Sequence, residues 1–141
     1  ERRAADGGET QATLAALCGQ PVLLFLWAEW CGDCKAQAAS LARVLQKHRA
    51  DGLRCIAVTR HYEDGDSARA IETVRADSMW SAVYAGLGGT PRVFSTASMV
   101  RYGVSATPTF AFVDRRGIVR RYTPTRLSES ELERALKTIL D

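Results

Sequence analysis

Residues 21–35 read PVLLFLWAEWCGDCK, an apolar run that leads directly into two cysteines. The run is continuous and rich in β-forming residues, which is typical of a strand buried on both faces. Helical spacing of side chains follows the cysteines as far as Ala50, and Asp51-Gly52 is a turn that ends this helix. Cys31 and Cys34 are therefore expected where a central strand passes into a helix.

The residues that recur at helical spacing after the cysteines are Leu41, Val44, Leu45 and His48. A second strand is predicted over residues 53–59, and a strand, a helix and a strand in this order form two parallel strands with a right-handed crossover. The remaining predicted elements are a strand at 91–94, a helix at 95–102, strands at 109–113 and 118–122, and a last helix that begins at the capping box of Ser128 and Glu131. This order predicts an α/β fold with a central mixed sheet flanked by helices.

The length and composition fit one domain. A chain of 141 residues that is 46% hydrophobic suits a single α/β domain over residues 1–141, with the polar residues 1–8 as a flexible lead-in. The longest apolar stretch is strand-sized and shorter than the roughly 20 residues that span a bilayer. The net charge is only +3, and no basic patch interleaved with aromatic residues is present, so no nucleic-acid partner is expected. A helix is predicted to start at Asp66, whereas residues 78–90 predict no element.

The position of the two cysteines predicts redox chemistry. Unpaired backbone N–H groups and the positive end of the helix dipole stabilise a thiolate at Cys31, which lowers its pKa below the free value of about 8.5. Cys34 follows three residues later on the same helical face and one turn deeper. Cys31 is therefore expected to attack a substrate disulfide, and Cys34 is expected to resolve the mixed disulfide.

A structural zinc site is the main alternative use of two such cysteines. It needs four ligands, yet Cys18 and Cys55 are isolated in the sequence, and His48 and His61 are not paired at zinc-finger spacing. We expect no metal and no bound cofactor besides the redox-active disulfide. Cys18 and Cys55 are expected to be buried free thiols outside the active site, with a structural disulfide between them as the alternative.

Two segments resemble those of thioredoxins. Residues 25–35 (FLWAEWCGDCK) are similar to the thioredoxin active-site segment, and residues 102–110 (YGVSATPTF) are similar to the cis-proline loop. The similarity covers roughly residues 20–140, and the segment between residues 60 and 100 resembles the insertion of TlpA-like (redoxin) reductases. The resemblance implies a thioredoxin-fold thiol:disulfide oxidoreductase with an α/β insertion between the second strand and the cis-proline loop.

The resemblance also implies a substrate-binding surface. Pro108 would be cis and face the dithiol, and the backbone of Thr107 would pair with an extended substrate chain. Trp30 would cover the dithiol and offer an apolar docking surface, although plain packing explains a tryptophan equally well. Gly32 and Asp33, which lie between the cysteines, complete the expected substrate-binding set.

The sequence departs from thioredoxins at two positions. Phe25 stands where thioredoxins carry a buried acid that helps to deprotonate the second cysteine, so Asp33, Glu29 and water are all open as the proton acceptor. Asp33 replaces the proline that usually lies between the cysteines. Its negative charge raises the Cys31 pKa, Lys35 offsets part of this effect, and a reduction potential near the roughly −270 mV of thioredoxin is expected.

Three other functions are possible for this fold. A thiol peroxidase would reduce a peroxide with Cys31, but peroxiredoxins need a threonine three residues before that cysteine, and this chain has Ala28. A copper metallochaperone would hold copper on the two thiolates with His61 as a third ligand. A binding module without catalysis would not need an intact C-x-x-C.

The expected partners are a protein disulfide substrate and an upstream dithiol electron donor, and the chain is expected to be a monomer. An apolar anchor or a signal peptide ahead of Glu1 would place the domain outside the cytoplasm. Because of the insertion, we expect an extracytoplasmic location, either periplasmic or with a membrane tether, rather than a cytosolic one.

Overall fold

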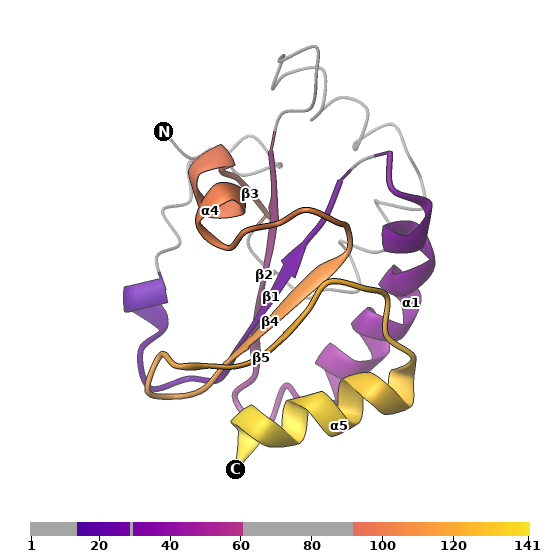
Figure 1. Cartoon of the computed structure of the whole chain (residues 1–141). Helices are drawn as coiled ribbons and strands as arrows, with labels where there is room; N and C mark the ends of the chain where they lie inside the picture. The colour runs from indigo at the N-terminus through magenta and orange to yellow at the C-terminus, as the bar shows by residue number, and fades with distance from the viewer. Residues whose placement is uncertain (1–13, 29, 61–91) are drawn as a thin grey trace.

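The elements of the fold are defined in a computed structural model that describes residues 14–28, 30–60 and 92–141. In these residues the order is a 3₁₀ helix η1 (Leu14–Leu17), β1 (Val22–Leu26), α1 (Gly32–Lys47), β2 (Arg54–Thr59), β3 (Arg92–Phe94), α4 (Thr96–Arg101), β4 (Thr109–Val113), β5 (Val119–Thr123) and α5 (Glu129–Leu140). The strands form a five-stranded sheet in the order β3-β2-β1-β4-β5 (Figure 1).

The sheet is mixed, as the sequence predicts. β1 pairs in parallel with β2 and antiparallel with β4, while β2 pairs in parallel with β3 and β4 antiparallel with β5. Every residue of β1 and β4 is buried, which explains why both strands read as continuous apolar runs. β1 is therefore the central strand of the sheet, and the cysteines follow its C-terminal end.

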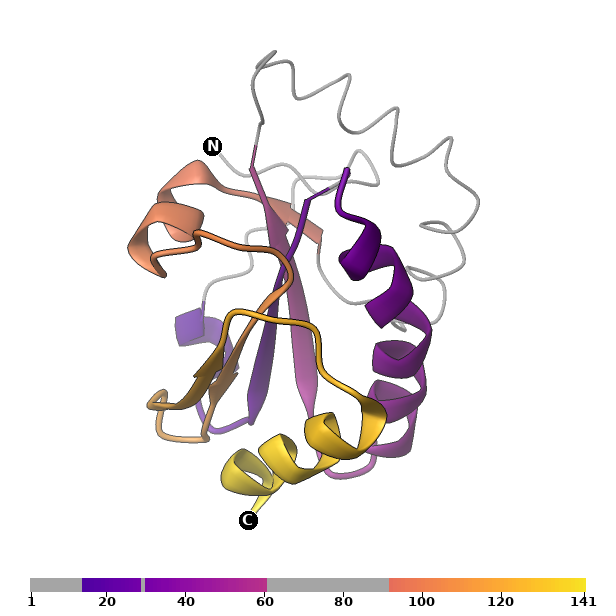
Figure 2. The same cartoon turned by 45° about the vertical axis from the view of Figure 1, so that its right-hand side comes forward.

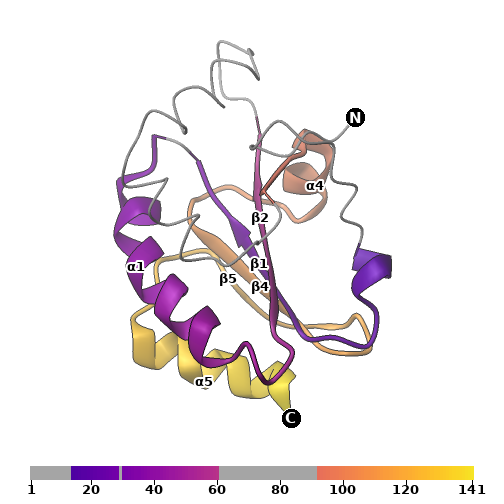
Figure 3. The same ribbon diagram turned by 180° about the vertical axis from the view of Figure 1, so that it is seen from behind.

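Helices cover both faces of the sheet. α1 and α5 lie on one face and α4 lies on the other (Figures 2 and 3). Side chains of β1 alternate between the two sides, so Phe25 packs in the core with α1 and α5, whereas Leu24 packs in the core with Met99 of α4. Phe25 also stacks on Phe110 of β4, with 5.4 Å between the ring centroids.

The observed ends of α1 and α5 can be compared with those that the sequence predicts. The capping box at the start of α5 is confirmed, because the Ser128 side chain accepts from the Glu131 N–H and the Glu131 carboxylate accepts from the Ser128 N–H. α1 ends at Lys47 rather than at Ala50, and His48 is its C-cap. The prediction that His48 belongs to the apolar face of this helix is wrong, because its ring contacts two carboxylates instead.

Several sequence predictions lie outside the described residues. These are the lead-in at residues 1–8, the helix from Asp66, the segment 78–90, and most of the insertion between residues 60 and 100, of which β3 and α4 are described. No helix within residues 14–28, 30–60 and 92–141 is both long and apolar enough to cross a membrane.

Candidate active site

The two predicted cysteines form a disulfide at the start of α1. Cys31 and Cys34 are bonded with 5.2 Å between their Cα atoms. Cys31 is the N-cap residue, and its sulfur accepts a hydrogen bond from the Cys34 N–H at 3.1 Å. The Cys31 N–H donates to the Ala28 carbonyl oxygen at 3.1 Å, which ties the end of the β1 segment to the helix.

This arrangement distinguishes the two sulfurs. Cys31 Sγ receives a backbone N–H at the positive end of the helix dipole, where negative charge on sulfur is stabilised. Cys34 is entirely buried, whereas Cys31 retains 4% of its surface and is followed by the exposed Gly32. The geometry therefore favours an outer attacking sulfur and an inner resolving sulfur.

The loop before β4 completes the site. The Thr107–Pro108 peptide bond is cis, which is the isomer that the resemblance implies, and Pro108 is buried. The Thr107 carbonyl oxygen lies 3.3 Å from Cys31 Sγ. The Thr109 hydroxyl donates to the Ala106 carbonyl oxygen at 2.6 Å and closes the turn. Since β4 pairs with β1, the sheet itself holds this loop against the disulfide.

The core behind Cys34 is aromatic rather than acidic. Phe25 is completely buried, and the buried polar side chains of the described residues are Gln37, Thr59 and Thr109, none of which titrates. Asp33 is exposed, and Glu29 lies outside the described residues. In the described part of the chain, the internal carboxylate of thioredoxins is thus replaced by the stacked ring of Phe25.

Three residues beside the buried disulfide are exposed. Trp30 is 63% exposed, and an added Cβ at Gly32 would meet no atom within 4 Å. The Asp33 side chain is 70% exposed. These three exposed residues lie at the predicted substrate-binding positions, next to the buried Cys31.

Two residues near the site were missed in the sequence analysis. Arg126 places Nη1 4.0 Å from Asp33 Oδ1, and the buried amide of Gln37 binds the backbone of Leu127. Both contacts join α1 to the segment between β5 and α5, about 90 positions further along the chain. No local spacing reveals such a contact, although a glutamine on the apolar face of a helix is itself unusual.

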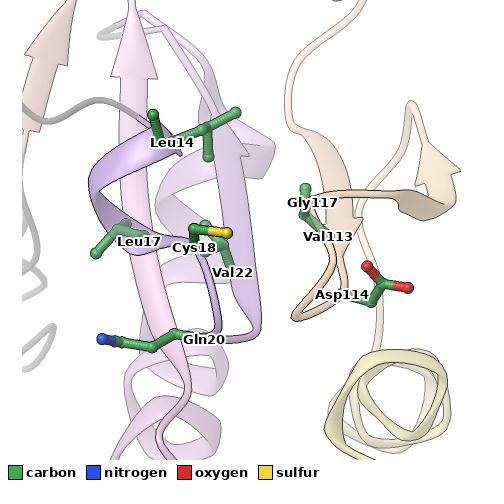
Figure 4. A pocket seen from close by; sticks show the side chains of 9 residues that line it. Leu14, Leu17, Cys18, Gln20, Val22, Val113, Asp114 and Gly117 are labelled. Atoms are coloured by element: carbon green, nitrogen blue, oxygen red, sulfur yellow. The ribbon is translucent and has the colours of Figure 1, made fainter.

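The other two cysteines are free and belong elsewhere. Cys55 is buried in β2, and burial raises its pKa to about 12. Cys18 is exposed, so the prediction that it is buried is wrong; it follows η1 directly and is not part of a buried strand. It lines a pocket of about 190 Å³ at the end of the sheet remote from the cis-proline loop, where Figure 4 shows it near Leu17 and Val22.

Metal-ligating side chains do not cluster in the part of the chain that the structure describes, since no three of His, Cys, Asp and Glu lie close enough together to hold an ion. His61, the third ligand of the copper hypothesis, lies outside the described residues.

Comparison with known proteins places this geometry among its relatives. The model of the AhpC/TSA family matches residues 2–122. The thiol:disulfide interchange protein DsbE of Xylella fastidiosa (strain Temecula1) is 27% identical over 124 residues, which cover 88% of this chain and 57% of that protein. The chain therefore spans little more than half the length of this relative.

Solved structures share the fold. The exposed lipoprotein thioredoxin Etrx1 of Streptococcus pneumoniae superposes with a TM-score of 0.78 at 21% identity, covering 96% of each chain. A secreted Mycobacterium tuberculosis disulfide oxidoreductase homologous to E. coli DsbE superposes with a TM-score of 0.75 at 20% identity, covering 96% of this chain and 92% of that one. These superpositions assign the thioredoxin fold to the chain.

Proposed function

The chain belongs to the AhpC/TSA family, and we propose that it is a thiol:disulfide oxidoreductase that reduces disulfides of other proteins. One observation carries this proposal. The Cys31–Cys34 disulfide lies at the N-terminus of α1, and its outer sulfur is 3.3 Å from the backbone of the cis-proline loop. A nucleophilic thiol, a resolving thiol and the backbone of the cis-proline loop are thereby brought together.

The reaction proceeds by two exchanges. In the dithiol form, the Cys31 thiolate attacks one sulfur of the substrate disulfide, forms a mixed disulfide and releases the other substrate sulfur as a thiolate. The Cys34 thiolate then attacks Cys31 Sγ, which forms the Cys31–Cys34 disulfide and releases the second substrate thiolate. Two electrons pass to the substrate, and an upstream dithiol donor must return them to the protein.

The substrate polypeptide binds between the cis-proline loop and the outer rim of α1. The backbone of Thr107 pairs with an extended stretch of substrate next to the attacked cysteine, and Pro108 lies beneath this stretch, facing the dithiol. Trp30 supplies an exposed aromatic surface, and Gly32 and Asp33 leave room for the substrate to approach Cys31. No bound cofactor takes part in this scheme.

A thiol peroxidase on the same fold is the alternative function. The residue three positions before Cys31 is Ala28, whose side chain has no hydroxyl to orient a peroxide. The carbonyl oxygen of Ala28 already accepts a hydrogen bond from the Cys31 N–H. The reductase is therefore the function that the site supports better.

The location of the protein is inferred from its relatives. We infer that the chain acts outside the cytoplasm, because the S. pneumoniae structure is an exposed lipoprotein and the M. tuberculosis structure is a secreted protein. Residues 1–141 act as one thioredoxin-like domain and as a monomer, either in the periplasm or held at the outer face of a membrane.

Substitution of each cysteine tests the assignment. Cys31→Ser abolishes insulin reduction, Cys34→Ser captures substrate as a mixed disulfide, and Cys18→Ser, which removes a remote exposed thiol, reduces insulin at the wild-type rate. A Cys31→Ser protein with wild-type activity would overturn the proposal. In a parallel assay the reduced protein consumes hydrogen peroxide slowly, and rapid turnover would establish the peroxidase instead.

A further inference from the structure

Gln37 is a buried polar residue one turn after Cys34. Its Nε2 donates to the Leu127 carbonyl oxygen at 2.9 Å, and its Oε1 accepts from the Leu127 N–H at 2.7 Å. Nε2 also donates to the Ser40 hydroxyl at 3.0 Å. The side-chain amide of α1 thus pairs with both backbone groups of a single residue that is 90 positions away.

These bonds fix the segment between β5 and α5 on the active-site helix. This segment crosses from β5 towards α1 before α5 begins (Figures 1 and 2). Leu127 is 4% exposed and packs in the core, and the next residue, Ser128, is held by the capping box. The backbone on the C-terminal side of Arg126 is therefore anchored by side-chain packing, by the amide pair and by the helix cap.

Arg126 extends from this anchored backbone to Asp33, one of the two residues between the cysteines. Its Nη1 lies 4.0 Å from Asp33 Oδ1, and both side chains are more than half exposed. An exposed pair of this kind contributes little to stability. The pair is nevertheless close in the chain to the sulfur that becomes a thiolate, because Asp33 is in the first turn of α1 and Cys31 is the N-cap of this helix.

We propose that Gln37 is a positioning residue for the dithiol: it holds Leu127, and thereby keeps the Arg126 guanidinium beside Asp33, where it offsets the negative charge next to Cys31. This inference rests on the proposed function only for the biological role of the dithiol. The redox equilibrium of Cys31 and Cys34 depends on Arg126 whatever the substrate.

The sign of the effect follows from the thiolate. A positive charge near Cys31 stabilises the ionised, reduced form, so its loss shifts the equilibrium towards the disulfide. For one charge at a solvent-exposed rim, Coulomb's law at high dielectric predicts a change of about two- to fivefold in the equilibrium constant. Added salt screens the charge, so the difference is smaller at 1 M than at 0.01 M ionic strength.

The experiment equilibrates purified protein with mixtures of reduced and oxidised glutathione and measures the fraction of the Cys31–Cys34 disulfide by mass spectrometry. Arg126→Gln shifts the equilibrium constant about two- to fivefold towards the disulfide, and Arg126→Lys keeps the wild-type value. Arg116→Gln is the matched control, because it removes an exposed arginine from the turn at the other end of β4. Gln37→Met shifts the constant in the same direction as Arg126→Gln.

The double variant decides whether Gln37 acts through Arg126. Gln37→Met combined with Arg126→Gln gives the same constant as Arg126→Gln alone, whereas a further shift in the double variant overturns the positioning role. An Arg126→Gln value equal to that of Arg116→Gln overturns the proposal even where Gln37→Met does not fold. Failure of the protein to reduce insulin refutes the proposed function and leaves these constants measurable.

Discussion

Protonation of His48 is expected to stabilise the junction between α1 and α5. Its Nδ1 lies 2.7 Å from Asp51 Oδ2 and its Nε2 lies 2.7 Å from Glu133 Oε2 of α5. Glu133 also accepts from Lys47 at 2.9 Å. Burial lowers the pKa of His48, but the hydrogen bonds to the two carboxylates outweigh burial and raise the pKa above its ordinary value of 6.5.

The magnitude follows from the exposure of the partners. The Asp51 side chain is 53% exposed, so its bond to His48 has the weight of a surface pair, about 0.2–1 kcal/mol. Glu133 is 24% exposed, and a charge-assisted bond there contributes up to about 1.5 kcal/mol. After the cost of burying the ring, we expect protonated His48 to contribute up to about 2 kcal/mol to the free energy of unfolding.

The pH dependence has a definite sign. Because the folded pKa of His48 is raised, its contribution is complete below about pH 6.5 and is lost as the pH rises through the folded pKa. Hydrogen bonds from Lys47 and His48 lower the pKa of Glu133, so its contribution is lost at the acid end, as the pH falls through its folded pKa.

Urea unfolding of the oxidised protein between pH 6 and pH 8.5 measures this contribution, because the disulfide removes the titration of Cys31 and Cys34. His48→Gln keeps a hydrogen-bond donor and removes the charge. The difference in unfolding free energy between wild type and His48→Gln is expected to be up to about 2 kcal/mol at pH 6 and to fall towards zero at pH 8.5. A difference that is independent of pH would refute this reasoning.

Three further results are expected. Because Asp33 is negatively charged, we expect the protein to be a reductant with a reduction potential near about −270 mV. The substitutions Asp33→Pro and Asp33→His are expected to make this potential more oxidising. A wild-type potential more oxidising than about −180 mV, measured in glutathione mixtures, would contradict the role of Asp33. Iodoacetamide modifies the exposed Cys18 of the folded, oxidised protein but spares the buried Cys55, so equal labelling in mass spectrometry would be incompatible with the structure. Leu132→Ala empties a fully buried site on α5 and lowers the free energy of unfolding by about 2–5 kcal/mol; a loss below about 1 kcal/mol in urea would show that the site is not packed.

The parts of the fold that the sequence predicts are those set by local patterns. The apolar run before Cys31 predicts a strand buried on both faces, and β1 is entirely buried. Ser128 and Glu131 predict a capping box, which forms at the start of α5. The dithiol is predictable for the same reason, because a C-x-x-C directly after such a strand lies at a helix N-terminus.

The contacts that the sequence does not predict are those between distant segments. His48 has the spacing of an apolar-face residue, yet it binds Glu133, which is 85 positions away. Arg126 has no local signal that relates it to Asp33. Gln37 shares the buried face of α1 with Leu41, and only the path of the chain after β5 supplies a backbone partner for its amide. Such pairs depend on the tertiary arrangement and not on periodicity.

An electron count between the dithiol and a protein substrate tests the central claim most directly. Fully reduced wild-type protein is mixed with an equimolar amount of insulin, and both proteins are alkylated and analysed by mass spectrometry as the reaction proceeds. We predict that one substrate disulfide is lost for each Cys31–Cys34 disulfide formed, through a transient species in which Cys31 is joined to the substrate. Loss of substrate disulfide without formation of the Cys31–Cys34 bond would contradict the account.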